Sequence, residues 1–172
     1  GLGSLYLTAT LARTLWPGRE DIAAAGPTIL LGCIFWTLFT TLTMFDMMLA
    51  LFTVMGLIGI LRAWQGQRWS GFGILAIAIA LGVLAKGPAI LLHVLPVALL
   101  APVWGASRPQ SLKPPDLRSW YLGIIAATLV GAALALTWAI PAAIAGGDAY
   151  AEAIFWGQSA GRMVKSFAHA KP

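Results

Sequence analysis

Four ionisable side chains could carry chemistry: Asp46 in the apolar stretch "TMFDMMLALF", Lys86 in "AKGP", and Arg162 and His169 in the closing "GRMVKSFAHAKP". An ionised side chain costs roughly 2.5 to 3.5 kcal/mol at the centre of a membrane helix on insertion scales, so such residues are functional by default. Lys86 could pair with a phosphate that enters from the lipid headgroup region. The closing basic residues could recognise a phosphate or a sugar.

Asp46 and Lys86 also have purely structural interpretations. Thr43 to Asp46 fits the Ser/Thr-x-x-Asp/Glu capping box that opens a helix, where a carboxylate suits the positive end of the helix dipole. Lys86 closes a helix, Gly87 can adopt the left-handed stop, and Pro88 opens the next helix at its first position. That pattern describes a helical hairpin with a snorkelling lysine. For Asp46 the structural and functional interpretations are compatible.

The segment from Gly147 onward has the pattern of an amphipathic helix that lies on the outer membrane surface. Arg162, Lys165 and His169 follow this helix, and the alternative to phosphate or sugar recognition is a solvated basic surface. His93, inside "ILLHVLPVALL", is expected to be buried and hydrogen-bonded, and we assign it no role.

The composition indicates an integral membrane protein. Of the 172 residues, 59% are hydrophobic and 10% are charged, and the mean hydropathy is +0.84. The net charge of +5 does not indicate nucleic-acid binding, because the basic residues are scattered between apolar runs. Cys33 stands alone, which excludes a disulfide framework and a CxxC metal site. The chain starts without Met and ends on a polar stretch, so we expect an internal piece of a longer polytopic protein.

The apolar runs predict an all-α, polytopic transmembrane bundle of about five to six membrane helices, with the amphipathic helix on its outer surface. Residues 1–146 would form the transmembrane region, and residues 147–172 an incomplete extracytoplasmic helix and loop. The second run is short and could span only by continuing through "TLFTTLTM". The predicted runs are Leu2–Trp16, Ile22–Trp36, Phe45–Trp64, Trp69–Ala85, Ala89–Trp104 and Trp120–Ile140.

The basic residues set the orientation. If the chain alternates sides, one face receives seven of the eleven Lys and Arg residues, and we expect that face to be cytoplasmic; these are Arg13, Arg19, Arg62, Arg68, Arg108, Lys113 and Arg118. Five tryptophans would form an aromatic belt at the same boundary: Trp16, Trp64, Trp69, Trp104 and Trp120. The opposite, extracytoplasmic face gathers Asp46, Lys86, Arg162, Lys165 and His169, which are far apart in the sequence.

Three stretches resemble one family of membrane enzymes: "TLTMFDMMLALFTVMGLIGILRAW", "LGVLAKGPAILLHVLPVALLAPVW" and "FWGQSAGRMVKSFAHAKP". They are similar to the GT-C glycosyltransferases that use polyprenyl-phosphate sugars, the group that includes the protein O-mannosyltransferases and the aminoarabinose transferase of lipid A. The resemblance extends from about Leu30 to the end of the chain.

The resemblance implies a multi-pass protein of the inner or plasma membrane. It would transfer a sugar from a polyprenyl-phosphate carrier to a protein, lipid or glycan acceptor on the extracytoplasmic side. Asp46 would orient the acceptor or support the catalytic site, Lys86 would contact the carrier phosphate, Arg162 would help neutralise it, and His169 would lie near the same cavity. No cofactor is assigned, no residue is assigned to a metal, and the need for a divalent metal stays open.

The sequence departs from the family in one respect. The main catalytic carboxylate of the family lies in the first extracytoplasmic loop, whereas the only earlier acids here, Glu20 and Asp21, fall on the cytoplasmic side. We therefore expect the 172-residue chain alone to be inactive. Two other classes stay open: a transporter segment with Asp46 and Lys86 as coupling residues, and a scaffold in which small residues pack helices, namely Gly56, Gly59, Ala76, Ala78 and Ala80.

Overall fold

The computed structural model describes residues 1–41, 45–105 and 115–147, and within these ranges all regular structure is helical. The predicted all-α class is therefore confirmed, whereas the outer-surface helix of residues 147–172 lies almost entirely outside the described residues. In chain order the helices are α1 (Leu2–Leu15), α2 (Glu20–Gly32), α3 (Ile34–Thr41), α4 (Phe45–Trp64), α5 (Arg68–Lys86), α6 (Ala89–Leu99), α7 (Ala101–Gly105) and α8 (Leu117–Gly146).

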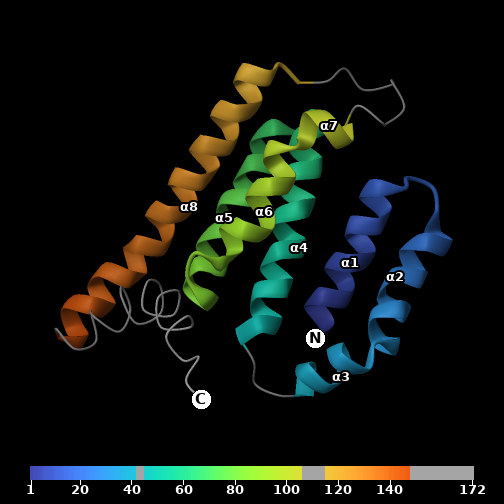
Figure 1. Cartoon of the computed structure of the whole chain (residues 1–172), viewed down its shortest axis with the longest axis horizontal. Helices are drawn as coiled ribbons and strands as arrows, with labels where there is room; N and C mark the ends of the chain where they lie inside the picture. The colour runs from blue at the N-terminus through green and yellow to red at the C-terminus, as the bar shows by residue number, and fades with distance from the viewer. Residues whose placement is uncertain (42–44, 106–114, 148–172) are drawn as a thin grey trace, which may run out of the picture.

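Helices α4 and α5 form an antiparallel hairpin at the centre of the bundle (Figure 1). They are joined by a tight turn in which Gly66 has a φ of 98°, a conformation that glycine adopts without strain. Their backbones approach closely, since a methyl group on Gly59 would lie 2.7 Å from the carbonyl oxygen of Gly71. Small residues allow this contact, as is usual where membrane helices pack.

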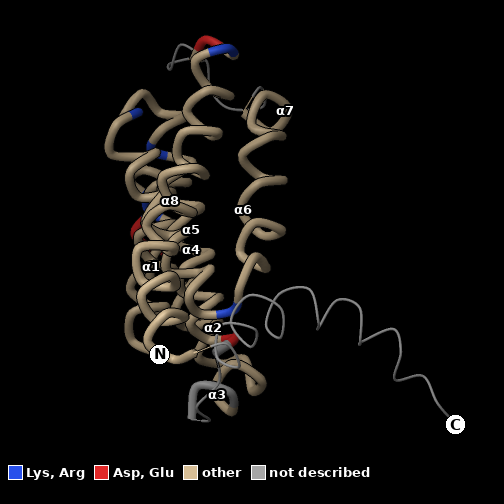
Figure 2. The backbone as a smooth tube through the Cα atoms, turned by 90° about the vertical axis from the view of Figure 1, so that its left-hand side faces the viewer, with Lys and Arg blue, Asp and Glu red and all other residues tan. Residues whose placement is uncertain are grey.

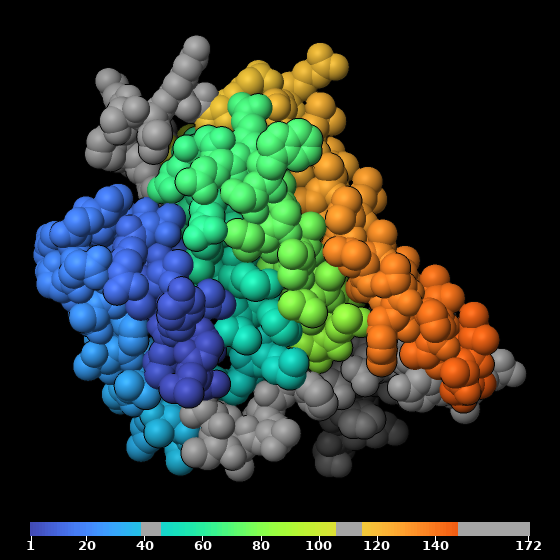
Figure 3. Space-filling view, turned by 180° about the vertical axis from the view of Figure 1, so that it is seen from behind, coloured from blue at the N-terminus to red at the C-terminus, as the bar shows by residue number. Residues whose placement is uncertain are grey.

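Helix α8 packs along α5, and the two lie side by side on one face of the bundle (Figure 3). A methyl group on Gly131 of α8 would lie 2.7 Å from the carbonyl oxygen of Ala76, so this contact also depends on a residue without a side chain. The packed stripe repeats at nearly every fourth residue: Trp120, Ile124, Ala127, Gly131, Ala135, Ala139 and Ala143. The remaining surface of α8 exposes large apolar side chains, as expected of a helix that faces lipid.

Helices α6 and α7 result from a break in one apolar run. Pro102 has no N–H to donate to the carbonyl of Ala98, so the α-helical ladder cannot continue there. The indole Nε1 of Trp120 donates to that carbonyl instead, at 3.0 Å, and Tyr121 Oη donates to the carbonyl of Leu99 at 3.2 Å. Two residues of α8 thereby satisfy backbone acceptors that the break leaves open.

Helices α1 to α3 lie beside the hairpin, with α1 packed on α4 and α2 packed on α1. The Gln65 side chain donates to the carbonyl of Thr14 at 3.2 Å and ties the end of α1 to the turn after α4. Arg13 pairs with Glu20 across the turn between α1 and α2, at 3.0 Å.

Three of the six predicted spans form helices long and apolar enough to cross a membrane: α4, α5 and α8. The run Ile22–Trp36 does not continue as one helix, because α2 ends at Gly32 and α3 begins at Ile34. The run Ala89–Trp104 divides into α6 and α7 at the break described above. These helices indicate membrane association, and both the multi-pass arrangement and the count of five to six helices stay predictions.

The predicted aromatic belt is corrected in part. Trp64 and Trp120 are 8% and 1% exposed, and their rings meet edge to face with centroids 4.9 Å apart. They belong to the interior, and the partly buried Trp104 packs against them with its ring 5.6 Å from that of Trp64. Trp16 and Trp69 are at the surface, and Trp69 is 95% exposed. A tryptophan near a helix end can pack in the protein core as readily as it can lie at the membrane interface.

Substituting Trp120→Phe should destabilise the fold by about 1 to 3 kcal/mol, because the buried carbonyl of Ala98 loses its donor while most of the apolar packing stays. The free energy of unfolding in mixed detergent micelles measures this. Trp138→Phe is the matched control, since Trp138 is exposed on the same helix. Equal stabilities for the two variants would contradict the assigned role of the indole N–H.

Candidate functional site

The α4–α5 hairpin brings Asp46 and Lys86 into contact although 40 residues separate them. The two residues are equidistant in sequence from Gly66, and antiparallel helices of 20 and 19 residues place such positions opposite each other. The ammonium Nζ of Lys86 donates to Oδ1 of Asp46, forming an ion pair. The structure therefore joins two of the four predicted site residues.

The two charges stand at helix ends of opposite polarity. Asp46 is in the first turn of α4, where free N–H groups favour an anion, and Lys86 is in the last turn of α5, where free carbonyls favour a cation. Gly87 ends α5 with a φ of 64°, and its N–H donates to the carbonyl of Val83 at 2.8 Å. The positive φ expected of Gly87 is confirmed, whereas Pro88 caps α6 instead of occupying its first position.

The ion pair lies at the surface of the described structure. The side chain of Lys86 is 36% exposed and that of Asp46 is 58% exposed. An exposed pair of this kind contributes at most about 1 kcal/mol to stability. Figure 2 shows basic and acidic colours together at the end of the bundle where α6 begins, opposite the end at which α8 starts. A ligand approaching that end could reach both groups.

The remaining candidates separate into two groups. Arg162 and His169 lie outside the described residues, as do Lys165 and Thr43, so the predicted capping box and basic tail stay predictions. His93 was expected to be buried, and this is wrong, because it is exposed on α6. Its Nδ1 donates to the carbonyl of Ala89 at 2.8 Å, so the predicted hydrogen bond is present.

Nothing in the described part of the chain gathers metal ligands. Across residues 1–41, 45–105 and 115–147, no three His, Cys, Asp or Glu side chains come together in a group that could hold an ion. Cys33 is exposed and does not form a disulfide. The need for a divalent metal therefore stays open.

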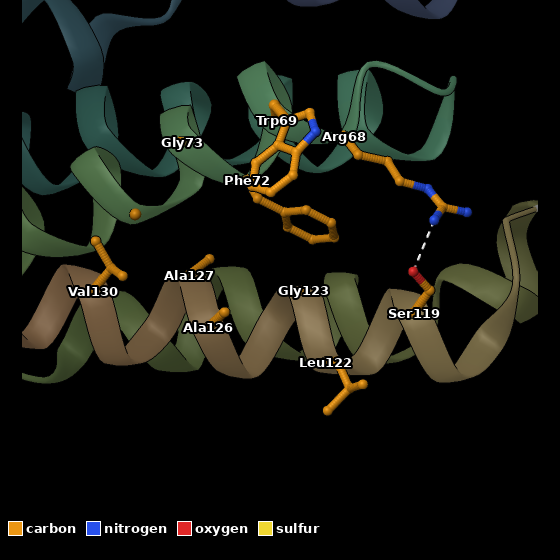
Figure 4. Close-up of a pocket in the computed structure, with 11 residues that line it drawn as sticks. Arg68, Trp69, Phe72, Gly73, Ser119, Leu122, Gly123, Ala126, Ala127 and Val130 are labelled. Carbon is orange, nitrogen blue, oxygen red and sulfur yellow. Dashed lines mark hydrogen bonds between the residues drawn. The ribbon is translucent and has the colours of Figure 1, made fainter.

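A groove that the sequence did not predict lies between α5 and α8 (Figure 4). We call it the α5–α8 groove, and it has a volume of about 500 Å³. At one end Arg68 Nη1 donates to Ser119 Oγ at 2.7 Å, and the rest of the lining is apolar. Its floor includes the small residues Gly73, Ala76, Gly123, Ala126 and Ala127. In the sequence, the small residues on these two apolar helices were the signal that could have predicted the groove. That α5 and α8 pair was not predictable, because it depends on how α8 packs.

Comparisons with known proteins give no family for this chain. No family model matches the sequence, no curated protein matches it, and no solved structure matches the fold.

The contact between the ends of α4 and α5 can be tested by crosslinking. In a Cys33→Ser background, Asp46→Cys with Lys86→Cys should be joined by a short bis-maleimide, so that the two helices stay linked after tryptic cleavage at Arg68. Arg62→Cys with Lys86→Cys is the control pair, because these positions lie about 25 Å apart along the hairpin at 1.5 Å per residue. Linkage of the control pair alone would contradict the antiparallel arrangement.

Proposed function

We propose that this chain forms part of an integral membrane glycosyltransferase of the GT-C type. It would transfer a sugar from a polyprenyl-phosphate carrier to a protein, lipid or glycan acceptor on the extracytoplasmic side of the inner or plasma membrane. The observation that carries the proposal is the Asp46–Lys86 ion pair. It unites, at one end of the hairpin, the two sequence stretches whose resemblance to that family is most specific.

The chemistry of the pair suits a phosphate leaving group. When an acceptor oxygen bonds to the anomeric carbon, the bond from that carbon to the carrier phosphate breaks and the electron pair stays on the phosphate oxygen. A positioned cation stabilises this developing charge. Lys86 would supply the cation, and its partial exposure leaves room for the phosphate beside Asp46.

Asp46 would have a positioning and acceptor-orienting role. Its carboxylate already holds the Lys86 ammonium, and its place in the first turn of α4 sets it beside the positive end of the helix dipole. Arg162 and His169 would add to phosphate neutralisation at the same end, as the resemblance implies. The acceptor proton would pass to a carboxylate of the kind that the family carries upstream.

The position of the pair also favours the transferase over a transporter. Coupling residues of transporters lie near the bilayer midplane, often at broken helices between repeats. Asp46 and Lys86 are instead at the ends of two helices that are each long enough to span. This geometry suits a headgroup at the membrane surface better than an ion crossing the membrane.

Lys86→Ala should lower sugar transfer at least tenfold in the protein as its gene encodes it, because a charged hydrogen bond of about 1.5 to 3 kcal/mol to the leaving phosphate is lost. Asp46→Asn should lower it less, and Lys86→Arg should retain part of the activity. The assay measures transfer from polyprenyl-phosphate mannose and polyprenyl-phosphate aminoarabinose in membrane vesicles, at matched protein levels.

Arg62→Ala is the control for this test, since Arg62 lies at the opposite end of α4. Normal transfer by both Lys86→Ala and Asp46→Asn would refute the assignment of these residues. A changed uptake of an ion or solute, with no transferase activity in the parent protein, would establish the transporter alternative.

A further inference from the structure

The α5–α8 groove lies at the opposite end of the hairpin from the Asp46–Lys86 pair. Arg68 begins α5 and Ser119 is in the first turn of α8, so the polar mouth of the groove is at the end where both helices start (Figure 4). From there the groove follows the two helices toward Ala76 and Val130 along apolar walls. A site with one polar end and one long apolar end matches an amphipathic molecule.

Arg68 has no carboxylate partner within the described residues. Its hydrogen-bond acceptor is the neutral Ser119 hydroxyl, so no carboxylate among the described residues neutralises the guanidinium at the groove mouth. Arginine binds phosphate through several N–H groups at once and is the side chain best suited to that anion. Trp69, next in sequence, is 95% exposed and lines the same mouth, as tryptophan does at the headgroup level of a bilayer.

The start of α5 adds a second attraction for an anion. Gln67 precedes α5 but makes no side-chain hydrogen bond to its first turn, whereas Asp116 caps α8 by accepting from the Ser119 N–H at 2.9 Å. The N–H groups that open α5 therefore have no side-chain cap, and they stand at the positive end of the helix dipole. Backbone N–H groups in this position are a common phosphate-binding device.

The described carboxylates at this end of the bundle are already engaged. Glu20 pairs with Arg13, Asp21 pairs with Arg19, and Asp116 caps α8. The hydrogen bonds from Arg19 hold the pKa of Asp21 below its ordinary value, so this acid stays charged and paired. Among the described residues, the cations without a carboxylate partner at this end are Arg62, Arg68 and Arg118.

We propose that the α5–α8 groove binds an anionic phospholipid of the adjoining leaflet. The lipid phosphate would contact Arg68 and the first N–H groups of α5, and one acyl chain would lie over Gly73 and Ala126, which line the groove from the two helices. The volume of about 500 Å³ is within the usual range for small-molecule sites. This lipid is bound at the opposite end of the hairpin from the proposed transferase site, and the inference does not depend on that function.

The groove can be filled without disturbing the fold. A Cβ built on Gly73 meets no atom within 4 Å, and Gly73 has an ordinary helical conformation, so Gly73→Leu should place its side chain in the groove without strain. Gly32→Leu is the matched control, because a Cβ there also meets nothing and the residue lies at the end of α2. For the headgroup, Arg68→Gln is matched by Arg62→Gln, which makes the same change in net charge on a helix that does not line the groove.

Native mass spectrometry of the detergent-solubilised protein measures binding of dioleoyl-phosphatidylglycerol and dioleoyl-phosphatidylcholine. The parent protein and the Gly32→Leu and Arg62→Gln variants should bind phosphatidylglycerol more tightly than phosphatidylcholine. Arg68→Gln should lower the affinity for phosphatidylglycerol about fivefold, to the level of phosphatidylcholine. Gly73→Leu should lower the affinity for both lipids.

Three results would overturn the proposal. Equal losses in Arg68→Gln and Arg62→Gln would mean that general surface charge attracts the lipid. Unchanged binding in Gly73→Leu would mean that the groove holds no acyl chain. A dimer that disappears in Gly73→Leu, with lipid binding unaffected, would mean that a second copy of the chain fills the groove.

Discussion

The close backbone contact between α4 and α5 is the constraint on which the rest of the structure depends. Because glycines and alanines line the contact, the two helices approach without intervening side chains, and their relative register is fixed by backbone atoms. That register alone decides that Asp46 faces Lys86 at one end and that Arg62 and Arg68 share the other. A larger residue at Gly59 or Gly71 would force the helices apart and shift both ends together.

The two ends of the hairpin have different electrostatic characters as a result. At the end with Asp46 and Lys86, opposite charges neutralise each other and each suits its own helix terminus. At the other end, cations exceed the carboxylates available to pair with them. Among the described residues, one end therefore carries a neutral ion pair, whereas the other has an excess of positive charge.

Much of this arrangement follows from the sequence, and the exceptions have clear causes. The run Phe45–Trp64 becomes α4 unchanged, and the meeting of Asp46 with Lys86 follows from a short turn between helices of nearly equal length. The break at Leu100 was missed, although Pro102 marks it, because hydropathy does not register a lost hydrogen bond. Two features were missed: the burial of Trp64 and Trp120, and the α5–α8 groove. Both depend on how α8 packs after the connection of residues 106–114, which periodicity does not determine.

The hydrogen bonds from Trp120 and Tyr121 to the α6–α7 break have a consequence for the order of assembly. A ribosome delivers Ala98 and Leu99 before it delivers α8, so the donors to these two carbonyls do not yet exist when the carbonyls reach the membrane. An unsatisfied backbone carbonyl in hydrocarbon costs several kcal/mol. The segment Ala89–Gly105 should therefore wait in the insertion machinery or at the lipid interface until α8 arrives, and the two segments should integrate as one unit.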